Sequence, residues 1–236
     1  MGYDRDPGLK TMPGRAPRYV GNILLWSGLL LVLSGFTGVV KAEWTGVAFE
    51  IADTTSGWEF SNGTRETTIS SLAFQIEERT ASGLSVGGGI GYMTIRIDGN
   101  EEVETKKFDG EFFEIYFRKE FSISESFSLE MLLDYGFYGG DENTSSDSRD
   151  DISWNQLGFD FSASFQLNNI RIAPFASYTD IDGDISGDDP TEVFTLEDEI
   201  GYGLRFDFFT ESTAFVRLQL QTGSYDGGYL TFVRRY

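Results

Sequence analysis

The clearest pattern in the chain is a strict alternation of apolar and polar residues between Gln156 and Leu167. Positions 157, 159, 161, 163, 165 and 167 are all apolar, and the positions between them are polar or glycine. A period of two places successive side chains on opposite faces of a β-strand, whereas a helix would scatter them around its axis. The run exceeds the ~5–6 residues usual for a strand and matches the ~9–11 residues that a tilted strand needs to cross a bilayer.

The same two-faced pattern recurs along the chain. It predicts about ten strands, at 44–52, 67–79, 84–97, 108–121, 126–138, 152–167, 169–180, 196–209, 213–223 and 228–236. Short connections at 80–83, 122–125, 168 and 210–212 alternate with longer ones at 53–66, 98–107, 139–151, 181–195 and 224–227. Outer-membrane barrels have short turns on one side, longer loops on the other, and an even number of strands. We therefore expect an all-β fold, a closed antiparallel up-and-down transmembrane barrel of about ten strands, with eight as the alternative.

Pro174 lies inside one predicted strand and removes a hydrogen-bond donor from the sheet. We expect a β-bulge at this position.

The N-terminal region has the order of a secretory signal peptide. Arg15 and Arg18 precede an apolar stretch at 23–33, and Val40-Lys41-Ala42 provides a small-x-small cleavage site. We expect residues 1–42 to be a signal peptide with an overlong start before Met12, and residues 43–236 to be the barrel domain. A membrane anchor that stays attached is the alternative. Export and the strand pattern together predict an outer-membrane location with both termini in the periplasm.

Composition narrows the class of protein. The chain has no cysteine and a formal net charge of −20, so disulfides cannot stabilise it and nucleic acid is not an expected partner. It also has no histidine. A serine without an adjacent base is a poor nucleophile, and a carboxylate pair for glycoside hydrolysis stays only formally open. We expect no enzyme activity and no cofactor.

The C-terminal residues provide a second signal. Leu230, Phe232 and Tyr236 share one face of the last predicted strand. This arrangement resembles the C-terminal β-signal by which the barrel-assembly machinery recognises outer-membrane barrels, although Arg234 departs from it. The segments GLSVGGGIGYMTIRI and EIGYGLRFDFF also resemble the small outer-membrane β-barrel family that includes opacity-type and OmpA/OmpX-type barrels. The resemblance implies a location and an architecture, with outer-membrane lipid, lipopolysaccharide and the assembly machinery as partners.

Charged residues recur on the polar faces of most predicted strands. If these faces line a lumen, acids and arginines can pair across it. The expected lumen network is Glu50, Glu77, Glu114, Arg118, Glu130, Asp134, Asp160, Arg171, Arg205, Asp207 and Arg217.

Three functions fit this pattern. We favour a structural or surface-interaction barrel with a filled lumen, since ten strands enclose far less space than the ~16–18 strands of porins. The second is a narrow cation-preferring pore, with free space beside Ser85, Gly87, Gly89 and Gly91. The third is a soluble periplasmic lipocalin-like barrel, whose apolar faces would turn inward to bind an apolar ligand. No sequence feature sets an oligomeric state.

One predicted loop resembles a calcium-binding loop. Asp180, Asp182, Asp184 and Asp188 have spacing like the first ligands of an EF-hand. Ile185 and Thr191 replace the glycine and the bidentate glutamate of that motif, so a solvated acidic loop is the alternative. Calcium held by this loop or by acidic residues at 141–151 would bridge the protein to lipopolysaccharide.

Overall fold

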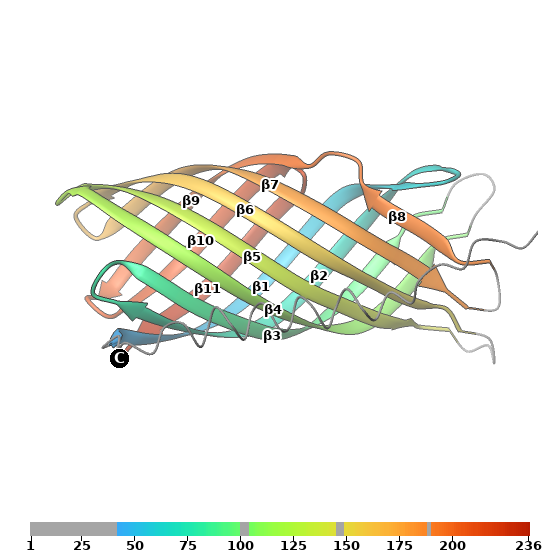
Figure 1. Cartoon of the computed structure of the whole chain (residues 1–236), viewed down its shortest axis with the longest axis horizontal. Helices are drawn as coiled ribbons and strands as arrows, with labels where there is room; N and C mark the ends of the chain where they lie inside the picture. Colours follow the sequence, from blue (N-terminus) through green and yellow to red (C-terminus); the bar gives the residue numbers. More distant parts are fainter. Residues whose placement is uncertain (1–41, 100–103, 145–148, 188–189) are drawn as a thin grey trace, which may run out of the picture. The chain divides into compact units, whose positions relative to one another are not determined.

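A computed structural model describes residues 42–99, 104–144, 149–187 and 190–236. Except for Ala42, the predicted signal peptide lies outside the described residues. Within these ranges, no helix is long and apolar enough to cross a membrane. The described residues form one antiparallel β-sheet that closes on itself (Figure 1).

The sheet has eleven strands. They are β1 (Ala42–Phe60), β2 (Gly63–Thr80), β3 (Leu84–Ile97), β4 (Lys106–Ser124), β5 (Phe127–Glu142), β6 (Asp151–Leu167), β7 (Ile170–Ser186), β8 (Glu192–Leu196), β9 (Ile200–Glu211), β10 (Ala214–Gly223) and β11 (Asp226–Arg235).

Ten of these strands form the main ring. β1 to β7 and β9 to β11 pair in chain order, and β11 pairs with β1 to close the barrel. A row of paired residues that starts at Phe165 of β6 returns to the same strand at Ser153. This displacement means that the strands tilt relative to the barrel axis, as closure requires. The prediction of a closed antiparallel barrel of about ten strands is confirmed.

The barrel narrows toward one end because β9, β10 and β11 are shorter than their neighbours. Beyond them, β8 pairs with β7 from Asp182 to Ile185 and with β1 from Trp58 to Phe60. At this level β1 to β8 form a ring of eight strands. We call this eight-stranded end the collar and the rest of the barrel the wide part.

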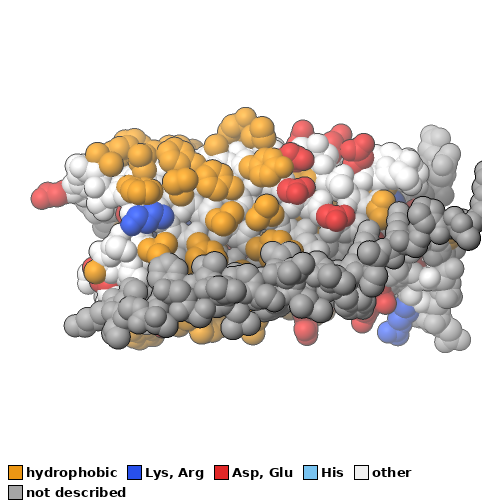
Figure 2. Space-filling view, viewed as in Figure 1, with side chains coloured by type: hydrophobic (Ala, Val, Ile, Leu, Met, Phe, Trp, Pro, Cys, Tyr) orange, Lys and Arg blue, Asp and Glu red, His pale blue; other side chains and the backbone are white. Residues whose placement is uncertain are grey.

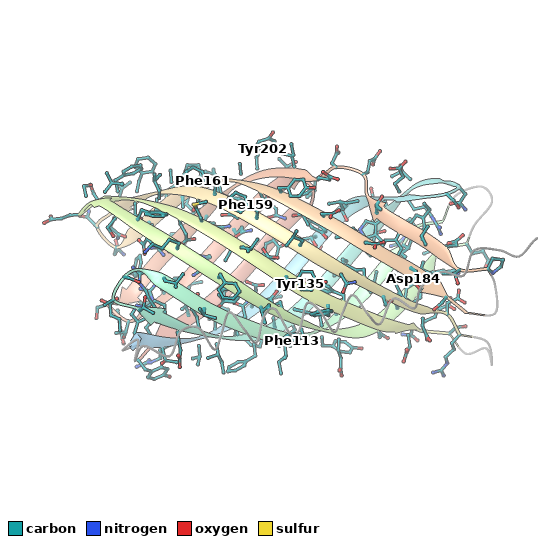
Figure 3. All side chains as sticks on the ribbon, viewed as in Figure 1. Phe113, Tyr135, Phe159, Phe161, Asp184 and Tyr202 are labelled. Carbon is teal, nitrogen blue, oxygen red and sulfur yellow. The ribbon has the colours of Figure 1, made fainter. Side chains whose placement is uncertain are left out.

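On strands that run through both parts, the two faces change polarity between them, as β6 shows. In the wide part, Phe159 and Phe161 are exposed on the outside, while Asp160 is buried inside. In the collar, Trp154 is buried inside and Ser153 is exposed outside. Space-filling and stick views show hydrophobic side chains over the wide part and acidic ones toward the collar (Figures 2 and 3). Because the apolar face of the wide part points outward, the lipocalin-like alternative is wrong for it.

The collar overturns part of the predicted loop pattern. The segment 53–66 is not a loop, because β1 and β2 extend through it to a turn at 61–62. β7 and β8 likewise occupy most of the predicted loop 181–195. The polar residues that looked like a loop form strand faces, with Thr54 and Ser56 buried on the inside along with the hydrophobic Trp58. Connection lengths therefore do not alternate strictly, and the asymmetry of the barrel lies in the strand extensions.

The expected bulge at Pro174 is also absent. The β6–β7 ladder lacks pairs opposite Pro174, but it resumes with the same register between Phe165 and Ile172. The ladder between β7 and β9 runs through Pro174 without a shift. A local interruption is enough to accommodate the missing donor.

Candidate functional site

The lumen of the wide part contains a cavity of about 250 Å³. We call it the lumen cavity. Its walls come from nearly every strand of the ring, because the inward positions alternate along each one. They include Glu50 of β1, Glu114 of β4, Asp134 of β5 and Arg217 of β10.

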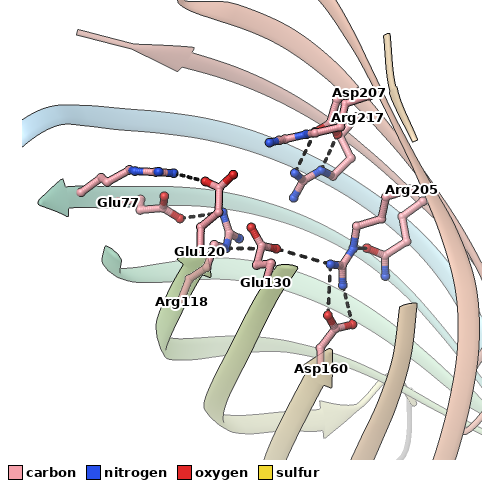
Figure 4. A network of polar contacts seen from close by, with 11 residues as sticks. Glu77, Arg118, Glu120, Glu130, Asp160, Arg205, Asp207 and Arg217 are labelled. Atoms are coloured by element: carbon pink, nitrogen blue, oxygen red, sulfur yellow. Dashed lines mark hydrogen bonds and ion pairs between the residues drawn. The ribbon is translucent and has the colours of Figure 1, made fainter. Parts of the chain in front are cut away.

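The structure places all eleven predicted network residues on the inside of the wide part, and it joins most of them. Arg205 donates two hydrogen bonds to Asp160, of 3.1 and 2.6 Å. Its guanidinium also lies 3.6 Å from Glu130, which is 3.7 Å from Arg118. Arg118 in turn lies 3.0 Å from Glu77. This chain of ion pairs links β2, β4, β5, β6 and β9 across the lumen (Figure 4).

A second group centres on one buried carboxylate. Asp207 accepts hydrogen bonds from Arg171 at 2.5 Å and from Arg217 at 2.7 Å. Its side chain is only 3% exposed. The two arginines compensate the buried negative charge of Asp207, and Asp207 gives each arginine an acidic partner. None of the three charges is therefore left unpaired.

The remaining three predicted members have no arginine partner among the described residues. Glu50 accepts a hydrogen bond from Thr231 at 2.9 Å, and Glu114 accepts one from Gln75 at 3.0 Å. Asp134 lines the lumen cavity beside them. Three carboxylates thus face the middle of the lumen without an ion pair.

Sequence reasoning missed several inward residues. Arg79 and Glu120 form an ion pair of 2.5 Å, and Arg235 lines the lumen cavity. Tyr138 and Tyr229 also line it. Each of these residues is separated by an even number of positions from a predicted network member or from another polar-face residue of its own strand. Residues with that spacing share a strand face, so the spacing could have indicated that they point inward.

Beyond the cavity, an apolar cluster fills the collar. We call it the plug. Its members are Trp58, Phe60, Met93, Ile95, Ile97, Phe108, Ile152, Trp154, Ile181, Ile185, Phe194, Leu196 and Tyr225. Trp58 stacks on Phe194 with ring centroids 4.4 Å apart, and Trp154 stacks on Tyr138 at 4.7 Å. Trp58, Phe108 and Phe194 are at most 1% exposed, so this end of the lumen is packed like a protein core.

A buried ion pair supports the plug from β2. The Arg65 side chain is 1% exposed and lies 2.6 Å from Glu192 at the start of β8. Its guanidinium also lies 3.5 Å from the centre of the Phe60 ring. These contacts attach the short β8 to the rest of the collar.

The glycine-rich face of β3 does not leave the space that we expected. A Cβ atom at Gly87 would overlap the ring of Tyr116, and one at Gly91 would overlap the ring of Phe112. The glycines allow large side chains of β4 to lie flat against the β3 backbone. The expectation of free space beside 85–91 is therefore wrong.

The predicted metal ligands lie on a strand rather than in a loop. Asp180, Asp182 and Asp184 alternate along β7 with the inward Ile181 and Ile185, while Asp188 lies outside the described residues. Side chains two residues apart on one strand face are parallel and do not converge. Among the described residues no group of three acids is arranged to hold a metal ion, and calcium binding stays a prediction.

Two residues of the predicted assembly signal lie on the outside of β11, and the third, Tyr236, directly follows the end of this strand. Leu230, Phe232 and Tyr236 are 37%, 46% and 72% exposed. They continue the apolar outer surface at the seam where β11 pairs with β1.

No protein-family model and no curated protein matches the chain. Solved structures do show likenesses. The outer membrane protease OmpT of Escherichia coli is 8% identical, with a TM-score of 0.47 over 85% of this chain and 96% of that one. Neisserial surface protein A is 10% identical, with a TM-score of 0.41 over 80% and 96%. An outer membrane channel from Pseudomonas putida F1 is 9% identical, with a TM-score of 0.42 over 83% and 96%. Structural similarities at this level do not indicate a function for this chain.

Proposed function

We propose that this chain is a non-enzymatic outer-membrane barrel that is closed to through passage and presents its collar to the outside of the cell. Its role is structural or surface interaction. The plug is the observation that carries this proposal. Its buried side chains fill the inside of the collar, and in the described residues they separate the lumen cavity from the collar end of the barrel.

The outer surface of the wide part supports a membrane location. Outward apolar positions on β6 run from Leu157 to Leu167. At a rise of ~3.3 Å per residue and a tilt of ~40°, this length covers about 25 Å, the height of the apolar band of outer-membrane barrels. A continuous exposed apolar surface of this size is unfavourable in water.

The charges at the two ends of this band support an orientation. Exposed acids gather on the collar side, among them Glu66, Glu111, Asp151, Asp180 and Asp182. The collar extends well beyond the band, whereas the opposite end has tight turns and both ends of the barrel chain. Placing the collar outside the cell puts the short turns and the termini in the periplasm.

The partners follow from this placement. Outer-membrane lipid covers the apolar band, and the acidic collar faces lipopolysaccharide, with divalent cations as the bridging ions. The assembly machinery recognises β11. We propose a role without catalysis and without a cofactor, since the chain has neither a histidine to act as a general base nor a cysteine nucleophile.

A planar-bilayer experiment tests the closed lumen. We expect the refolded wild-type barrel to be silent. The double variant Trp58→Ala/Phe194→Ala, which removes the stacked pair of the plug, should give stepwise conductance. Stepwise conductance of the wild type would contradict the proposal, as would a silent double variant whose folding is verified by heat-modifiable migration.

A narrow cation-preferring pore is the second candidate. It is supported by Glu50, Glu114 and Asp134, which face the middle of the lumen without an arginine partner. This function requires a water-filled path through the collar. Cation-selective conductance in the wild type, reduced by Glu114→Gln, would favour the pore over the closed barrel.

A further inference from the structure

Arg235, at the end of β11, is an unusual member of the lumen. It is the one inward-facing arginine of the described residues that forms no ion pair, whereas Arg65, Arg79, Arg118, Arg171, Arg205 and Arg217 all have acidic partners. The Nε atom of Arg235 is buried without a hydrogen-bond partner, as are those of Arg65, Arg79 and Arg118, so the missing acidic partner is what distinguishes Arg235. A buried guanidinium donor without a partner is unfavourable unless something binds to it.

Two aromatic rings fix the position of this guanidinium. Its Cζ atom lies 4.5 Å from the centre of the Trp44 ring and 5.0 Å from that of Phe215. Rings on both sides hold the planar group through cation–π contacts and leave its edge as the donor surface. Trp44, Phe215 and Arg235 all line the lumen cavity, so that edge borders open space.

Other arginines surround the same two rings. Arg79 lies 6.0 Å from the centre of the Trp44 ring, and Arg171 and Arg217 lie 6.0 and 5.6 Å from that of Phe215. The nearby acids already have arginine partners. Glu77 pairs with Arg118, and Glu43 lies 3.8 Å from Arg79. Asp207 is shared by Arg171 and Arg217, and Glu120 pairs with Arg79.

Among the described residues, Arg235 is therefore left at this end of the lumen without an acidic partner, in a chain whose net charge is −20. Guanidinium groups bind carboxylates and phosphates through pairs of parallel hydrogen bonds. We propose that Arg235, held between Trp44 and Phe215, is the centre of an oxyanion-binding site at the mouth of the lumen formed by the start of β1 and the end of β11. Its ligand is a carboxylate or a phosphate group that enters from this end.

The plug lies at the opposite end of the lumen, so the site is accessible in a closed barrel. It is also independent of the closed-barrel proposal, because a conducting barrel would carry the same arginines. The inference and the proposed function can therefore fail separately.

Isothermal titration calorimetry of the refolded barrel in nonionic detergent at low salt tests the site. The probes are inorganic phosphate and succinate, which distinguish the two oxyanion classes. We expect saturable binding of at least one probe, weakened by added sodium chloride because salt screens the charges. Absence of saturable binding for both probes would overturn the proposal.

Neighbouring arginines provide a matched control. Arg235→Gln should weaken binding by about tenfold or more, since it removes a charged donor pair. Arg234→Gln removes the same charge from the next residue, whose side chain is exposed on the opposite face, and should leave the affinity unchanged. Equal effects of the two variants would show that only net charge matters and would overturn the site.

Arg235→Lys keeps the charge and covers the case in which Arg235→Gln does not fold. It loses the planar fork, so its affinity should lie clearly below that of the wild type. Affinity equal to the wild type would contradict a site built on the stacked guanidinium.

Discussion

Trp58 of β1 stacks on Phe194 of β8 with ring centroids 4.4 Å apart and planes 8° from parallel. The two residues come from distant parts of the chain, and their contact is the centre of the plug. Together with the rest of the plug, it fills the inside of the collar and packs β8, the shortest of the described strands, against β1. One aromatic pair thus links the strand that completes the collar to the packing inside it.

The first prediction concerns this pair. In a double-mutant cycle with Trp58→Leu and Phe194→Leu, the coupling free energy should be about 0.5–1.5 kcal/mol, the range for aromatic pairs beyond their burial. Urea unfolding from lipid vesicles measures it. Strictly additive effects would mean that the two rings are held independently.

The second prediction concerns the ion pair of Asp160 and Arg205. Asp160→Ala leaves the buried Arg205 guanidinium with its hydrogen bond to Gln219 and with Glu130, 3.6 Å away, as its acidic partner. It should lower the free energy of unfolding by about 3–5 kcal/mol. The double variant Asp160→Leu/Arg205→Met removes both charges and should be closer to the wild type. If the double variant were less stable than Asp160→Ala, the ion pair would add net stability to the barrel rather than only keep two buried charges from being unpaired.

The third prediction concerns topology. Because the chain has no cysteine, one introduced thiol reports one position. Ser61→Cys, in the turn after β1, should react on intact cells with a maleimide too large for porins, while Ser82→Cys, in the turn after β2, should react only after lysis. The opposite labelling pattern would reverse the orientation of the barrel.

The fourth prediction concerns assembly. Deletion of Tyr236 should lower the amount of folded barrel in the outer membrane far more than Asp182→Ala does, because β11 must close the ring and an open edge in lipid leaves backbone groups unpaired. The heat-modifiable band of membrane fractions measures this amount. Normal assembly without Tyr236 would show that the resemblance to the assembly signal has no functional meaning.

The barrel class and the faces of most strands followed from the alternation. The predicted strand 152–167 agrees with β6 to within one residue, and Asp160 points inward as expected. The prediction succeeded because alternation is visible within a single strand, and because the apolar outside and the polar lumen of the wide part differ strongly in polarity.

The collar did not follow from the sequence. Its strand extensions have polar outer faces and contain many Ser, Thr and Gly residues, which are also typical of loops. β8 has only five residues and gains its place by pairing with β1, far away in the sequence. The unpaired state of Arg235 likewise depends on which strands close the ring, which no local pattern encodes.

The central claim is that the strands that run through both parts of the barrel, β1 to β7, meet lipid on their outside in the wide part and water on their outside in the collar. Arginine substitutions at three positions of β6, compared by urea unfolding from lipid vesicles, test it most directly. Phe159→Arg should lower the free energy of unfolding by about 2–4 kcal/mol, as expected for a charge on the lipid face near the midplane. Trp154→Arg should lower it by at least about 3 kcal/mol, because it places a charge in the plug. Ser153→Arg should change it by less than about 0.5 kcal/mol, as for an ordinary surface position. A neutral Phe159→Arg, or a Ser153→Arg as destabilising as Phe159→Arg, would contradict the account.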